Sequence, residues 1–167
     1  MPQKDIVIPF IKIKDRSVFS LDELYKLMFR WFESRNYDFQ EREYRDEDMG
    51  GGKKHLEIVW YAERKIDDYF KFIIEINFLI VGLEDTEVER DGVMVKTDKG
   101  EIEMKIKAYI LKDYDKKWEK NPVMRFFREI YDKKLVKSRI EGYEGELYEE
   151  TYRLLNDVKS FLNLHRF

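Results

Sequence analysis

Residues 70–80 read FKFIIEINFLI, and this stretch decides the fold class. Its apolar residues recur at every second position, which is the spacing of a β-strand with one dry face and one wet face. Lys71 and Glu75 fall on the other face, so we expect them to be mostly exposed. The residues that we expect to be buried are Phe70, Phe72, Ile74, Ile76, Phe78 and Ile80. A strand of this kind belongs to an antiparallel sheet that is covered on one face only.

The same alternation continues on both sides of this strand. It recurs over residues 56–62 and 102–110, and the dipeptide Asp91-Gly92 between them is a strong hairpin signal. Residues 98–100 read as a further turn, and residues 39–45 as a short polar strand. A first strand is expected over residues 6–13, and Pro9 favours a place for it at a sheet edge. The middle of the chain is therefore predicted to be an antiparallel meander.

Three helices are expected around this meander. Ser20 with Glu23 forms a capping box that opens a helix to about Asn36. Asn121 and Pro122 suit the cap and first position of a second helix, which we expect to run toward residue 139. A final helix is expected from about residue 146, after two glycines that loosen the preceding stretch. Because the wet face of the strands is charged, all helices should cover the other face.

These elements predict an α+β fold, with a curved antiparallel β-sheet (meander) and helices packed on one face, in a single domain over residues 1–167. The order of elements resembles the helix-grip arrangement of START-like domains. In that arrangement a curved sheet wraps a long final helix over a cavity. The resemblance is one of layout, and no site residue is carried across with it.

Composition excludes several classes of protein. The chain has no cysteine, so disulfides, thiolate nucleophiles and zinc–thiolate sites are excluded. Its net charge of −3 favours neither nucleic acid nor an anionic membrane as a partner of the whole molecule. The longest apolar run, residues 72–83, is too short to span a bilayer, and the amino terminus has no signal-peptide layout. We therefore expect a cytoplasmic protein, and its Lys- and Glu-rich composition is typical of heat-adapted proteins.

No local motif of the sequence indicates a catalytic residue, a metal site or a cofactor site. Residues 46–48 and His55 have side chains that can bind metal ions, but they lack the spacing of a calcium-binding loop. Residues 50–54 lack the spacing of a phosphate-binding loop. An enzyme is therefore the less favoured class. Carboxylate acid–base chemistry, by Glu63, Glu75 or Asp67, stays open. Glu75 and Asn77 interrupt the most apolar strand, and alternation explains both as wet-face residues.

The region 116–139 is strongly basic, and the following residues 141–157 are acidic, with six acids against Arg153, so the two segments could pair with each other. In the basic region nine lysines and arginines stand against three acids, a local excess of six positive charges, and aromatic residues are interleaved with them. This combination suits phosphate contacts with stacking, or an interfacial helix. On the expected helix Phe126 and Phe127 would cover the sheet and leave Arg125 and Arg128 outward or lateral. The candidate binding residues are Lys116, Lys117, Arg125, Arg128, Lys133, Lys134 and Lys137.

Three functions remain open from sequence. The first is a non-enzymatic binding module that encloses an apolar small molecule between sheet and helices. The second is a module that docks an anionic partner, RNA, a ribonucleoprotein or an acidic protein, through the basic helix. The third is an enzyme with carboxylate chemistry. An enclosed cavity would favour the first, and a filled core with exposed basic residues would favour the second.

Overall fold

The computed structural model describes residues 3–116, 120–130 and 137–164. Five strands form one antiparallel sheet in the order β1-β5-β4-β3-β2, so β1 and β2 are its edges. The elements follow one another as β1 (Gln3–Phe19), α1 (Leu21–Ser34), β2 (Asp38–Gly50), β3 (Lys53–Lys65), β4 (Phe70–Arg90), β5 (Val93–Lys112), α2 (Pro122–Ile130) and α3 (Lys137–Leu164).

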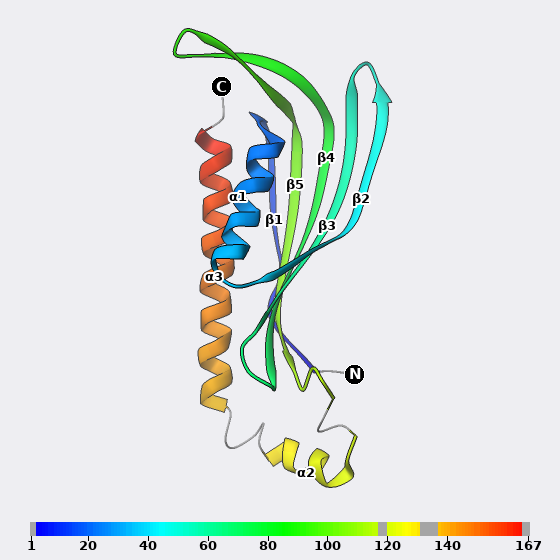
Figure 1. The fold of residues 1–167 in the computed structure, drawn as a ribbon, viewed down its shortest axis with the longest axis vertical. Coiled ribbons are helices and arrows are strands. Elements are labelled where there is room, and N and C mark those ends of the chain that lie inside the picture. The colour runs from blue at the N-terminus through cyan, green and yellow to red at the C-terminus, as the bar shows by residue number, and fades with distance from the viewer. Residues whose placement is uncertain (1–2, 117–119, 131–136, 165–167) are drawn as a thin grey trace.

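The helices α1 and α3 lie on the same side of this sheet, and the β4–β5 hairpin bends toward that side (Figure 1). The helix α2 stands apart from them, beyond one end of the sheet (Figure 1). The predicted α+β class and the antiparallel meander are thereby confirmed, and so is the packing of helices on one face for α1 and α3, whereas α2 does not cover the sheet.

The core lies between the sheet and the two helices. All six alternate residues of β4 from Phe70 to Ile80 are buried, as the alternation predicts. They pack against side chains of α1 such as Met28 and Phe32, and against side chains of α3 such as Leu154 and Val158. These residues belong to one continuous cluster, so side chains fill the space between sheet and helices.

Helix starts follow local chemistry. The Ser20 hydroxyl accepts a hydrogen bond from the Glu23 amide at 3.2 Å, as the capping box requires. The final helix begins much earlier than expected, at Lys137, and contains both Gly142 and Gly145. Tyr143 stands between these glycines and packs its ring on Phe70 and Phe72, which stabilises the early turns.

The turn that we expected at residues 98–100 is instead a continuation of β5. The irregularity lies opposite, where the register shifts between Val81 and Glu84 and Gly82 adopts a φ of +67°. A Cβ on Gly100 would come within 3.2 Å of the Leu83 Cα, so the two strands approach closely there. A bulge that bends the sheet therefore replaces the predicted turn.

The sheet face away from the helices differs from expectation at two residues. Lys71 and Glu75 are half-buried rather than mostly exposed. The Tyr109 hydroxyl donates to Glu75 at 2.7 Å, and the Lys71 ammonium lies 3.3 Å from a Glu63 oxygen. Large side chains of neighbouring strands cover this face in place of helices, and they bury Ile73 completely.

Candidate functional site

The helix α2 begins where the sequence predicts. The Asn121 side-chain oxygen accepts a hydrogen bond from the Val123 amide at 2.9 Å, and Pro122 is the first helical residue. Its described part ends at Ile130, whereas the pattern predicted a helix toward residue 139. Asparagine as cap and proline at the first position leave few amides unpaired at this end.

Arg128 faces the domain, which corrects the expectation that it points outward or to the side. Only 7% of its surface is exposed, and its Nη1 lies 3.5 Å from the Asp113 carboxylate, which follows β5. Asp113 is itself almost completely buried. A buried carboxylate needs a compensating cation, and Arg128 is the residue of α2 that supplies one.

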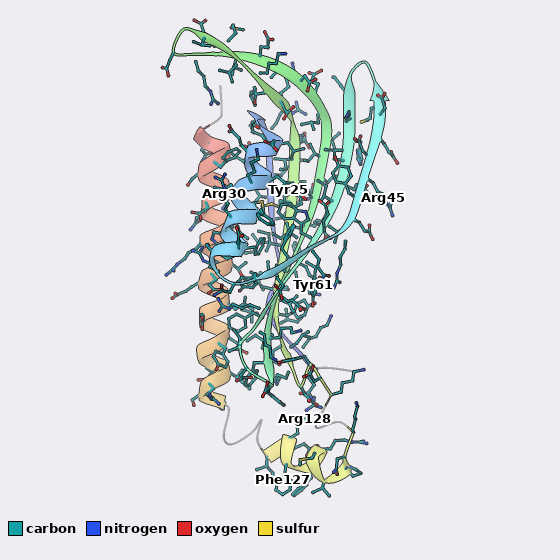
Figure 2. All side chains as sticks on the ribbon, viewed as in Figure 1. Tyr25, Arg30, Arg45, Tyr61, Phe127 and Arg128 are labelled. Atoms are coloured by element: carbon teal, nitrogen blue, oxygen red, sulfur yellow. The ribbon has the colours of Figure 1, made fainter. Side chains whose placement is uncertain are left out.

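The apolar side of α2 faces solvent, which corrects the second half of the same expectation. Phe126 is 62% exposed and Phe127 is 52% exposed, so neither ring covers the sheet. Figure 2 shows Arg128 on the side of α2 nearer the sheet and Phe127 on the far side. We call this exposed set the apolar face of α2, and it consists of Val123, Met124, Phe126, Phe127 and Ile130. The helix is therefore docked with its polar side inward.

Other predicted binding residues are distributed around this helix. Arg125 on α2, Lys116 before it and Lys137 after it are all exposed. Lys120 and Arg139, which the segment also contains, are exposed as well. Lys117, Lys133 and Lys134 lie outside the described residues. The apolar face thus stands in a segment that is rich in exposed cations.

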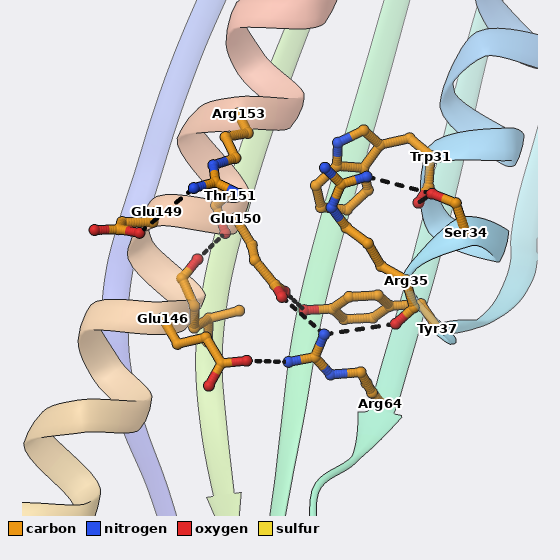
Figure 3. A network of polar contacts seen from close by, with 11 residues as sticks. Trp31, Ser34, Arg35, Tyr37, Arg64, Glu146, Glu149, Glu150, Thr151 and Arg153 are labelled. Carbon is orange, nitrogen blue, oxygen red and sulfur yellow. Dashed lines mark hydrogen bonds and ion pairs between the residues drawn. The ribbon is translucent and has the colours of Figure 1, made fainter.

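A polar network fastens α3 to the sheet (Figure 3). The Arg64 guanidinium donates to Glu150 and to Glu146, each at 2.8 Å, and the Tyr37 hydroxyl donates to Glu150 at 2.6 Å. Burial, together with the Glu150 charge, raises the pKa of Tyr37. A neutral tyrosine, a cation and two carboxylates thus satisfy one another's hydrogen bonds and hold α3 against the sheet. We call this network of Tyr37, Arg64, Glu146 and Glu150 the clamp on α3.

The hollows of the described surface lie elsewhere. Five of them have volumes between 220 and 630 Å³. The hollow of 250 Å³ opens where the start of α1 meets the sheet, because Leu21 lines it together with Leu56 and Leu83. The hollow of 630 Å³ opens at the bulge beside Gly82 and Gly100. Glu75 and Asn77 line the hollow of 220 Å³, next to the exposed Phe10. These are shallow surface features rather than an enclosed chamber.

Within residues 3–116, 120–130 and 137–164, no three acidic or histidine side chains converge to hold a metal ion. His55 lies 3.3 Å from Glu57, its neighbour on the same strand face. No helix in these ranges is long and apolar enough to cross a bilayer.

The sequence analysis singled out this segment for its positive charge and did not predict an exposed apolar face. The signal was present, because the apolar residues of 122–130 fall on one side of a helix. Comparison with protein-family models and with curated proteins finds no match to this chain.

Proposed function

We propose that this protein is a non-catalytic interaction module that contacts an anionic partner through the apolar face of α2 and the cations beside it. One observation carries the proposal: α2 is held by Arg128 against Asp113 and turns Phe126 and Phe127 to solvent. Apolar surface is driven out of water, and a continuous exposed patch of this kind typically marks an interaction site. The exposed Arg125 and Lys120 favour a partner with negative charge.

The other two functions have less support. Side chains of the core cluster occupy the region where an enclosed apolar ligand would lie. The carboxylates that could act in catalysis have structural partners: Glu63 pairs with Lys71, Glu75 accepts from Tyr109, and Asp67 accepts from two backbone amides. We therefore favour the surface of α2 over both alternatives.

Site-specific photocrosslinking tests the proposal. A benzophenone amino acid is placed at Phe126 in one protein and at Phe10 in a matched control, because both rings are exposed to a similar extent, 62% and 64%, on different surfaces. After irradiation in native extract, we expect covalent adducts from position 126 and few from position 10. Equal adduct yields at the two positions, or none at position 126, would show that α2 is not the contact element.

A further inference from the structure

We infer that the partner of α2 is an anionic lipid surface, on which the helix lies in the plane of the headgroups. This inference rests on the proposed function and names its partner. Four features of the described residues support it: the distribution of side chains around α2, the charges beside it, its place in the molecule and the small area of its apolar face.

The side chains divide α2 lengthwise. At about 100° per residue, Val123, Phe126 and Ile130 fall on one side of the helix, and Arg125 and Arg128 fall on the other. The Phe126 and Phe127 rings are adjacent, with centroids 6.0 Å apart. A helix with aromatic and aliphatic residues on one side and arginines on the other is the type that inserts its apolar side into the boundary between headgroups and acyl chains.

Most of the exposed charges that lie close to α2 in the sequence are positive. Glu129 is the only acid of α2, and Arg125 is exposed on the same helix. Lys120 directly before the helix, and Lys137 and Arg139 at the start of α3, are exposed as well. Cations at the edge of an inserted apolar face attract anionic headgroups, and this attraction adds to the apolar contribution. A neutral lipid surface lacks that second contribution.

The place of α2 lets a flat surface reach it. The helix lies at one end of the long axis of the molecule, past the end of the sheet (Figure 1), and its labelled Phe127 points away from the domain (Figure 2). A planar surface that approaches this end meets α2 before it meets the described parts of α1 and α3. The apolar face and the approach direction therefore coincide.

A second copy of the chain fits the apolar face of α2 less well than a lipid surface does. The exposed fractions of the five apolar residues correspond to an area on the order of 500 Å², whereas a stable interface needs about 800 Å² from each partner. Two such faces in contact would also bring Arg125 and Lys120 of both copies together. A lipid surface requires no complementary shape and supplies the opposite charge.

RNA is also a poorer occupant of this face. Bases can stack on aromatic rings such as Phe126, but they offer little to Val123, Met124 and Ile130, which belong to the same exposed set. Acyl chains and glycerol groups bury all five residues alike. Both partners would lose affinity with salt, so salt dependence alone does not distinguish them.

Vesicle co-sedimentation tests the inference. The full chain is mixed with vesicles of equimolar phosphatidylglycerol and phosphatidylcholine, and with vesicles of phosphatidylcholine alone. Four proteins are compared: wild type, F126S/F127S, K120E/R125E, and the control F10S, which removes an equally exposed ring from the sheet. We expect wild type and F10S to bind the anionic vesicles equally. Both α2 variants should bind them at least about tenfold more weakly, and wild type should bind the neutral vesicles weakly.

The outcomes separate this inference from the proposed function. Each variant is first shown to unfold at the same denaturant concentration as wild type, which we expect because the replaced side chains are exposed. If wild type does not bind anionic vesicles, or if F126S/F127S binds as wild type does, the lipid inference is wrong. Crosslinks from position 126 to RNA or protein, with no vesicle binding, would leave the proposed function standing with another partner. Absence of both signals would overturn both.

Discussion

Phe72 and Phe10 show how strongly the surroundings of a single ring decide its contribution to the free energy of unfolding. Phe72 is completely buried in the core, and Phe10 is 64% exposed on β1. Phe72→Ala removes buried apolar surface and leaves a cavity, so it should lower the free energy of unfolding by about 3–5 kcal/mol. Phe10→Ala should change it by no more than about 0.5 kcal/mol. Urea unfolding of the two variants measures the difference, and similar losses would contradict the assigned burial.

The clamp on α3 allows an equally direct comparison of two neighbouring carboxylates. Glu150 accepts from both Arg64 and Tyr37, whereas Glu149 pairs only loosely with Arg153 at 3.8 Å in solvent. Glu150→Gln should cost about 1.5–3 kcal/mol because it weakens charge-assisted bonds in a partly buried place. Glu149→Gln should cost at most about 0.5 kcal/mol. Thermal unfolding at matched pH compares them, and equal costs would mean that the clamp contributes little.

Asp98 links stability to pH. Burial, and then the nearby charge of Asp85, raises the pKa of Asp98, while a hydrogen bond from the Leu21 amide opposes that change. A carboxyl with a raised folded-state pKa binds more protons in the folded protein than in the unfolded one. Wild type should therefore lose stability as the pH rises from about 4, the unfolded value, through the folded-state pKa.

Asp98→Asn should remove this part of the pH dependence and keep the acceptor for Leu21. Unfolding curves of wild type and Asp98→Asn, recorded across the acidic range, give the difference between the two proteins. The prediction fails if that difference does not change with pH.

The orientation of α2 depends on one buried ion pair. Arg128 lies against Asp113, and Arg125 of the same helix is exposed. Arg128→Ala should release α2 from the domain and speed the amide hydrogen exchange of residues 123–130. Arg125→Ala should leave that exchange unchanged, because it removes a similar side chain without removing the contact. Faster exchange in both variants would mean that the ion pair is not the contact that holds α2.

Elements whose environment is local were predictable from sequence, and those set by distant residues were not. Alternation over residues 70–80 predicted which side of β4 is buried, and the Ser20 cap predicted the start of α1. The pattern of residues 122–130 predicted two sides of a helix but not which side meets the domain, because that is decided by Asp113 outside the pattern. The glycines of α3 suggested a loop, yet the ring contacts of Tyr143 offset their cost of roughly 1 kcal/mol each.

The molecule as a whole must keep its open sheet edge from pairing with other chains. The outer edge of β2 has no partner strand in the described sheet, and the strand is rich in charged side chains such as Glu43, Arg45 and Glu47. Charges on an edge strand discourage edge-to-edge association. Replacing these three residues by threonine should increase the apparent mass in light scattering after size exclusion.

A matched control makes the same net change of charge on α3, at Glu141, Glu149 and Arg153, which are exposed on a helix. This variant should keep the apparent mass of wild type, because a helix offers no unpaired backbone edge. An equal increase in mass for the two variants would assign the effect to lost charge in general.

The pairing of β1 with β5 has a consequence for how the chain folds. Asp5 lies opposite Ile110, so the first strand of the sheet finds its partner only when the last strand is present. The β2–β3 and β3–β4 pairs can form over short separations, whereas β1 must close a loop of much of the chain against its entropy. Docking of β1 is therefore expected to be a late step. A ribosome-bound chain that stops before β5 would carry β1 as an unpaired strand, with Ile8 and Ile13 awaiting burial.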